Sequence, residues 1–145
     1  MKAIWKNKIL AQSEFTWNVN PLLNEVRHAL KNLLASGETT IIDLRSIPLS
    51  PGEEVKILHI LGKGEVQSRL NAMGLSEIFE TQYSGVWVVT HFNSDAEIMS
   101  RFIEITTVPE ILCSQIEDIS IGYEELVIAL EEEQDKNEPE EEILL

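Results

Sequence analysis

The chain has 145 residues, a length that suits one domain with a single hydrophobic core. Hydrophobic residues make up 43% of it, so the composition favours a folded protein over a disordered one. Its formal net charge of -14 disfavours nucleic acid and anionic membrane surfaces as partners, because like charges repel. No apolar run approaches the length of a membrane span, and the N-terminus lacks the apolar core of a signal peptide.

The single cysteine, Cys113, excludes an internal disulfide and fits a reducing compartment. Together with the missing signal peptide, this predicts a cytoplasmic protein. The negative charge is unevenly distributed, because residues 131–145 hold eight acidic residues and a single base, Lys136. Such a composition predicts an acidic, disordered tail over 131–145.

The first part of the chain predicts an arm followed by a helix. Residues 1–19 favour either a small hairpin or a loosely docked N-terminal arm. Residues 20–36 predict a helix, with Asn20 as the N-cap, Pro21 in the first helical position and Gly37 as the stop. The apolar positions of this helix recur at helical spacing. They are Leu22, Leu23, Val26, Leu30, Leu33 and Leu34.

A strand is predicted next, over residues 39–44. The adjacent Ile41 and Ile42 indicate that both faces of this strand are buried. Asp43 and Arg45 follow at the exit of the strand. Their opposite charges favour an ion pair that fixes the corner, rather than a catalytic role.

A second helix is predicted over residues 51–61. Ser50 and Glu53 have the spacing of a capping box, and Gly62 is placed to end the helix. The glycines Gly62 and Gly64 do not form a phosphate-binding loop, because such a loop opens a helix and these end one. The predicted apolar face of the helix consists of Val55, Leu58 and Leu61.

From Glu65 onward the hydrophobic period changes to two, which is typical of strands. Strands are predicted over 65–72, 75–82, 86–92 and 98–106, and their short connections indicate an antiparallel meander. The sequence after them predicts helical structure over 108–130, with Gly122 as a separator between two helices.

The predicted fold class is therefore α+β. An antiparallel β-meander sheet of four or five strands packs with about three to four helices in a domain over residues 20–130. The arm over 1–19 and the acidic tail over 131–145 flank this domain.

The chain carries no recognisable catalytic pattern, so we expect no enzyme activity, no cofactor and no metal. His28 and His59 fall on predicted helices and His91 on a strand, which is not the clustering of a metal site. An enzyme would require perturbed groups in one deep pocket, and Glu65, Glu80 and His91 are the residues that would have to converge there.

Four segments, in this order along the chain, resemble the HupH/HyaF-type hydrogenase expression proteins, which are accessory factors of [NiFe]-hydrogenase maturation. They read IDLRSIPL at 42–49, LGKGEV at 61–66, ETQYSGVW at 80–87 and VPEIL at 108–112. The likeness extends over residues 22–119. Each motif alone is weakly specific, but four in register are fairly specific.

The resemblance implies a chaperone or scaffold that binds the hydrogenase small subunit, which carries iron–sulfur clusters, or its precursor. A thioredoxin-like maturation factor is a further partner that it implies. Family members commonly carry two related units and this chain carries one, so a homodimer is also expected. The alternatives are a small enzyme that acts on a hydrogenase assembly intermediate and a generic homodimeric interaction module.

The partner-binding surface is predicted at an exposed strand edge or on the Trp87 face of the meander. Arg45, Glu65 and Glu110 are expected at nearby corners. Tryptophan is favoured at the centres of binding surfaces, although packing in the core is the alternative role for Trp87. Replacement of Trp87 with alanine separates the two roles. A partner contact predicts weaker binding by a folded protein, whereas a core role predicts loss of the cooperative thermal transition.

Overall fold

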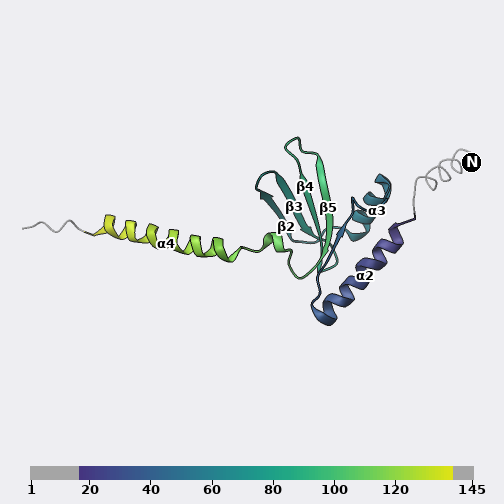
Figure 1. Cartoon of the computed structure of the whole chain (residues 1–145), viewed down its shortest axis with the longest axis horizontal. Coiled ribbons are helices and arrows are strands. Elements are labelled where there is room, and N and C mark those ends of the chain that lie inside the picture. The colour runs from purple at the N-terminus through teal and green to yellow at the C-terminus, as the bar shows by residue number, and fades with distance from the viewer. Residues whose placement is uncertain (1–16, 139–145) are drawn as a thin grey trace, which may run out of the picture. The chain divides into compact units, whose positions relative to one another are not determined.

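The computed structural model describes residues 17–138 (Figure 1). Residues 1–16 and 139–145 lie outside this description, and with them most of the predicted arm and the end of the predicted tail. The chain divides between Pro109 and Glu110 into two compact units, each of which is described by itself.

The first unit is built on one five-stranded sheet, in the spatial order β1-β5-β4-β3-β2 (Figure 1). The strands β2 to β5 follow one another in the chain and pair antiparallel, and β1 pairs antiparallel with β5. This confirms the predicted antiparallel meander within an α+β fold. The strands are β1 (Thr40–Asp43), β2 (Gln67–Asn71), β3 (Leu75–Glu80), β4 (Val86–Phe92) and β5 (Ile98–Ile105).

Strand β4 lies at the centre of the sheet, as its β-branched and aromatic residues favour. Its bounds are those predicted, and its first five residues are all buried. Successive side chains alternate between the two faces of the sheet. Val86 faces Ile105 and Val88 faces Ile103, and these pairs belong to the face that the helices cover.

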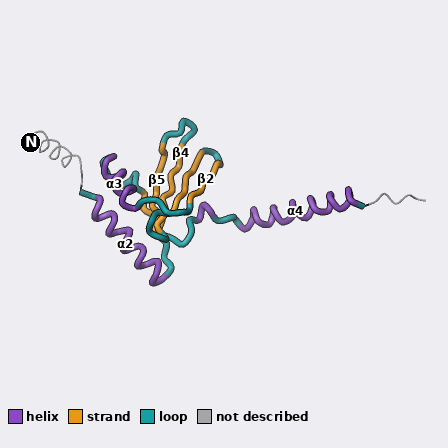
Figure 2. Tube along the Cα trace, turned by 180° about the vertical axis from the view of Figure 1, so that it is seen from behind, coloured by secondary structure: helices purple, strands orange, loops and turns teal. Residues whose placement is uncertain are grey.

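Two helices, α2 (Val19–Ser36) and α3 (Pro51–Leu61), cover one face of this sheet. Figures 1 and 2, which are seen from opposite sides, both place the two helices together on the same side of the strands. The hydrophobic core fills the space between them and the sheet. Its members are Val19, Leu22, Val26, Ala29, Ile42, Leu44, Ile57, Leu61, Val86, Ile103 and Ile105.

Helix α2 confirms the predicted helix but begins one residue earlier, at Val19. The predicted N-cap, Asn20, therefore lies inside the helix, and the preceding Asn18 provides no side-chain cap. Gly37 ends the helix as predicted, in the left-handed conformation with φ 74°. The sequence placed Leu34 in the apolar stripe of this helix. Leu34 is 88% exposed, so it does not belong to the face that packs in the core.

Strand β1 is exposed on one face, so the prediction that both faces are buried is wrong. Ile42 packs in the core, whereas Ile41 is 64% exposed because it points to the opposite face of a strand at the edge of the sheet. The predicted ion pair at the corner is also wrong. Asp43 Oδ1 instead accepts the backbone N–H of Arg45 at 2.9 Å, and the Arg45 guanidinium lies 3.9 Å from Glu54.

Helix α3 confirms the predicted capping box. Ser50 Oγ accepts the backbone N–H of Glu53 at 3.3 Å, and Glu53 Oε1 accepts the backbone N–H of Ser50 at 3.1 Å. The predicted apolar face is partly wrong. The helix buries Glu53, Ile57 and Leu61, which lie four residues apart, whereas Val55 is 67% exposed.

The second unit consists of a 3-10 turn, η1 (Glu110–Leu112), and the helix α4 (Ile116–Asn137). The predicted helix over 108–130 was wrong in its bounds and in its break. Gly122 lies inside α4, because one glycine in a helix costs only about 1 kcal/mol relative to alanine. Residues 131–137, which the sequence assigned to the acidic tail, are helical.

Candidate protein-binding surface

Two of the four motif segments meet where α3 gives way to the sheet. Gly64 donates its backbone N–H to Glu80 O at 2.7 Å, and the N–H of Glu80 donates to Val66 O at 2.9 Å. The N–H of Gln82 donates to Leu61 O at 3.0 Å. The motifs LGKGEV and ETQYSGVW therefore join α3, β2 and β3 into one frame. The backbone N–H of Gly64 is engaged in this frame.

Replacing Gly64 with alanine is expected to destabilise the fold by about 2 kcal/mol, because overpacking a tight contact forces the backbone to move. A Cβ atom at this position would lie 2.6 Å from the backbone oxygen of Thr81. The free energy of unfolding in urea measures the loss.

The comparison variant is Gly37→Ala, where φ is 74°, a left-handed value that Gly64 does not have, and where no atom lies within 4 Å of the added Cβ. This variant isolates the backbone strain, which costs roughly 1 kcal/mol. A Gly64→Ala variant as stable as Gly37→Ala would contradict the predicted clash.

Strand β2 forms an edge of the sheet, because it pairs only with β3 in the part of the chain that the structure describes. Its residues are exposed apart from the half-buried Ser68. Val66 and Glu80 form a hydrogen-bonded pair, so the antiparallel alternation turns the backbone groups of Gln67, Arg69 and Asn71 toward the open side. This edge can therefore pair with another extended chain.

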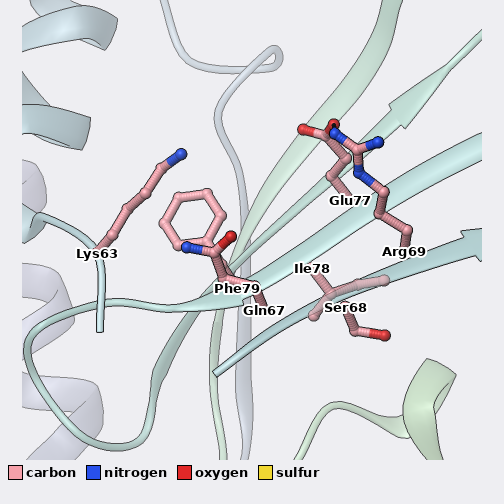
Figure 3. A pocket seen from close by; sticks show the side chains of 7 residues that line it. All are labelled: Lys63, Gln67, Ser68, Arg69, Glu77, Ile78 and Phe79. Carbon is pink, nitrogen blue, oxygen red and sulfur yellow. Dashed lines mark ion pairs between the residues drawn. The ribbon is translucent and has the colours of Figure 1, made fainter. Parts of the chain in front are cut away.

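A pocket of about 380 Å³ adjoins this edge (Figure 3). Lys63 enters it from the connection after α3, and its Nζ atom lies 5.1 Å from the centre of the Phe79 ring. Arg69 on β2 and Glu77 on β3 face each other across the ladder, with 3.4 Å between their charged groups. Figure 3 shows the Lys63 and Arg69 side chains on either side of the Phe79 ring.

The pocket concentrates two cations in an acidic chain with only eleven lysines and arginines. Arg69 shares its charge with Glu77, but 77% of the Arg69 side chain is exposed, so the ion pair is weak. Lys63 lies against the aromatic face of Phe79, which favours a cation without neutralising it. An incoming carboxylate is therefore the ligand that this charge pattern suits.

A second, apolar groove of about 310 Å³ lies between α2, the end of α3 and the turn before β4. Leu23 and Leu30 line it from α2, Ile60 from α3 and Tyr83 from the turn. This groove opens onto the hydrophobic core, and its apolar lining suits a large apolar side chain.

Three of the four predicted partner-binding residues lie at different places in the first unit, and the fourth, Glu110, lies in the second unit. Glu65 is exposed two residues before the start of β2 and so lies near the open edge. Arg45 is exposed in the connection between β1 and α3, beside Glu54. Glu110 is exposed at the start of η1, in the second unit.

Trp87 is buried rather than exposed, with only 5% of its surface accessible. Its indole Nε1–H donates to the backbone oxygen of Thr106 at 3.1 Å. Tryptophan is usually hydrogen-bonded when buried, and this contact ties β4 to the chain that follows β5. The environment of Trp87 thus favours the packing role, and its contact with a partner stays a prediction.

The three residues named for an enzyme site do not converge in one pocket, because His91 lies at the far end of the sheet from Glu65 and Glu80. Glu80 accepts the backbone N–H of Gly85 at one end of the β3–β4 pair. His91 lies toward the other end, with its Nδ1 atom 2.7 Å from Ser76 Oγ, and neither His91 nor Glu65 lines the pocket or the groove. Within residues 17–138, no three His, Cys, Asp or Glu side chains form a group that could hold a metal ion.

No helix in the described part of the chain is long and apolar enough to cross a membrane. The first unit thus offers an open strand edge with a basic pocket at β2, an apolar groove and a second strand edge at β1. Sequence reasoning named an exposed strand edge but missed Lys63, Arg69 and Phe79. The register of β2 on β3 would have indicated two of these residues, because it pairs Gln67 with Phe79 and Arg69 with Glu77.

The family model described as "HupH hydrogenase expression protein, C-terminal conserved region" matches residues 16–132. The chain belongs to the HupH family. This confirms the family that the four motifs predicted. The match covers both units, so α4 up to residue 132 falls within the conserved region of the HupH family.

Individual HupH-family proteins agree with this assignment. The hydrogenase expression/formation protein HoxQ of Azotobacter vinelandii is 30% identical over 111 residues, and HupH of Rhizobium leguminosarum bv. viciae is 25% identical over 101 residues. These matches cover 75% and 70% of this chain but 39% and 36% of the relatives. The chain therefore spans less than two fifths of the length of these curated relatives.

A solved structure also matches this HupH-family chain. It is that of the hydrogenase expression protein HupH from Thiobacillus denitrificans ATCC 25259, with a TM-score of 0.78 and 36% sequence identity. The match covers 81% of this chain and 98% of the solved one. The similarity thus extends over nearly the whole of that HupH structure.

Proposed function

We propose that this protein is an accessory factor of [NiFe]-hydrogenase maturation that binds the hydrogenase small subunit or its precursor in the cytoplasm. It acts as a chaperone or scaffold and not as an enzyme. The support is the family, whose members are named for hydrogenase expression and formation. The separation of His91 from Glu65 and Glu80 agrees with a binding role.

The observation that carries this proposal is the open edge of β2 beside the basic pocket. An extended segment of the client adds to β2 as a further strand, through backbone hydrogen bonds at Gln67, Arg69 and Asn71. An acidic side chain of the client enters the pocket and meets Lys63. A thioredoxin-like maturation factor and a second copy of this chain are the further partners in this proposal.

Replacing Arg69 with proline is expected to weaken binding to the small subunit about tenfold or more, or by ~1.4 kcal/mol. Proline removes one backbone N–H on the open side and obstructs an added strand, whereas the β2–β3 ladder uses the backbone groups of Ser68 and Leu70. Calorimetric titration with the purified small subunit measures the change in Kd.

The matched control is Arg69→Ala, which loses the same side chain but keeps the backbone N–H. We expect this variant to bind two- to threefold more weakly than the unchanged protein, because an exposed ion pair contributes little. Equal affinities for the alanine and proline variants would contradict strand addition at β2.

The broader proposal is tested by using the protein as bait in cells that produce the hydrogenase. Recovery of the small subunit or its precursor, identified by mass spectrometry, is the expected result. Capture of the bait alone, with abundant hydrogenase in the same cells, would count against stable client binding. Mutation of Arg69 to proline should reduce the recovery if the edge of β2 forms the interface.

A further inference from the structure

Helix α4 contains a seven-residue repeat. Residues 116–136 divide into IEDISIG, YEELVIA and LEEEQDK, which align without a gap. Apolar residues occupy the first and fourth positions of the repeat, which is the pattern of a helix that packs along another helix. These residues are Ile116, Ile119, Tyr123, Leu126 and Leu130.

The apolar stripe of α4 is exposed in the described chain. Leu126 is 60% exposed and Tyr123 is 69% exposed, and no residue of the helix is buried. A continuous stripe of large apolar side chains facing water is unfavourable, and such surfaces mark sites of association.

The charges of α4 are arranged so that a second copy of the same helix can pack against it. Acidic residues occupy the second and third positions of every repeat, on the side away from the stripe. The fifth and seventh positions, which flank the stripe, are uncharged in the first two repeats. These flanking residues are Ser120, Gly122, Val127 and Ala129. Over the first two repeats, the contact surface of α4 therefore carries no charge for a second copy to oppose.

The third repeat favours an antiparallel arrangement. Its fourth position holds Glu133, which would face its own copy in a parallel pair. In an antiparallel pair, Glu133 lies opposite Ile116 at the start of the partner helix, where the helix dipole favours a negative charge. Ile119 then packs opposite Leu130, and Tyr123 opposite Leu126. The small residues at the flanks, glycine and alanine, allow the two backbones to approach closely.

We propose that two copies of this protein associate through an antiparallel pair of α4 helices, with the apolar stripe as the interface. This deepens the second-copy part of the function proposed above by naming its surface. The test uses the purified protein without any hydrogenase, so a failure of this inference is distinguishable from a failure of client binding.

The mass of the full chain in solution, measured by light scattering or analytical ultracentrifugation, is the first test. We expect a dimer with twice the chain mass of 16.4 kDa. Leu126→Glu should weaken the dimer at least about a hundredfold, because it buries a charge in each copy. Ile128→Glu is the matched control, because Ile128 is 55% exposed on the same helix but points away from the stripe.

Several outcomes would overturn the inference. These are a monomeric parent protein at the highest soluble concentration, an equal loss of the dimer in both variants, and a dimer that survives Leu126→Glu. A Leu126→Glu variant that stays at the mass of the parent but melts at lower temperature would show that α4 packs on its own chain.

Val127→Glu, at a flanking position, gives a second variant that should also dissociate the dimer.

The orientation is tested with a spin label on Cys113, which is exposed shortly before α4. In the antiparallel pair the two labels lie roughly 35 Å apart, given a rise of about 1.5 Å per helical residue. A parallel pair would bring them within roughly 20 Å, because paired helices lie about 8–10 Å apart. Pulsed electron paramagnetic resonance measures this distance, and the short value would overturn the antiparallel arrangement.

Discussion

Replacing Trp87 with alanine is expected to destabilise the first unit by about 4 kcal/mol, which is a typical loss for a buried tryptophan. The ring is 95% buried at the centre of the sheet, so its removal leaves a cavity that the rigid neighbouring strands cannot fill. The loss of the indole N–H also leaves the Thr106 carbonyl without this donor. Urea unfolding followed by circular dichroism measures the change.

Trp87→Phe serves as the control, because it keeps most of the ring volume and removes the hydrogen bond. We expect this variant to lose roughly half as much stability, ~2 kcal/mol. A Trp87→Ala variant that unfolds cooperatively near the parent midpoint, but binds the small subunit weakly, would instead assign Trp87 to the partner contact.

Replacing Glu53 with alanine is expected to cost about 3 kcal/mol, because two partly buried backbone N–H groups lose their acceptor. Glu53 is fully buried. Its Oε1 atom accepts the N–H of Ser50, and its Oε2 atom accepts the N–H of Asn18 at 3.0 Å. The carboxylate thus fastens the start of α2 to the start of α3. The free energy of unfolding in urea reports the loss.

Two variants of α3 make this measurement specific. Glu53→Gln keeps one carbonyl oxygen as an acceptor and should lose less stability than the alanine variant, because one of the two contacts survives. Val55→Ala lies on the exposed side of the same helix and should change the stability by less than about 0.5 kcal/mol. Similar losses at Glu53 and Val55 would contradict the assigned role of the carboxylate.

The parts of the fold that follow from local chemistry were predictable from the sequence. The capping box of Ser50 and Glu53 and the left-handed Gly37 depend on neighbours within a few residues, and both are present as predicted. The bounds of β4 also follow from its own run of β-branched residues.

The features that depend on distant neighbours were not predictable. Nothing near Ile41 in the chain indicates that β1 lies at an edge of the sheet, with one face open. The capping box correctly identified Glu53 as a cap, but its contact with Asn18 joins residues 35 positions apart. The basic pocket likewise requires the register of β2 on β3, which brings Arg69 opposite Glu77.

The break of α4 was mispredicted for a different reason. Gly122 was interpreted from its own low helix propensity, although the seven-residue pattern continues through it on both sides. Propensity is a weak indicator where a longer pattern favours one continuous helix. The candidate surface was therefore predictable only in kind, as an exposed edge, and not in its residues.

The order of the strands has a consequence for how this protein folds. The pairs from β2 to β5 join neighbours in the chain, whereas β1 pairs with β5 across 65 residues, from Thr40 to Ile105. Closing that long loop has a high entropic cost before any contact compensates for it. We therefore expect the meander to form first and β1, with the helices beside it, to dock late. The kinetic signature of this topology would be a folding intermediate in which the backbone amides of β4 are protected from hydrogen exchange and those of β1 are not.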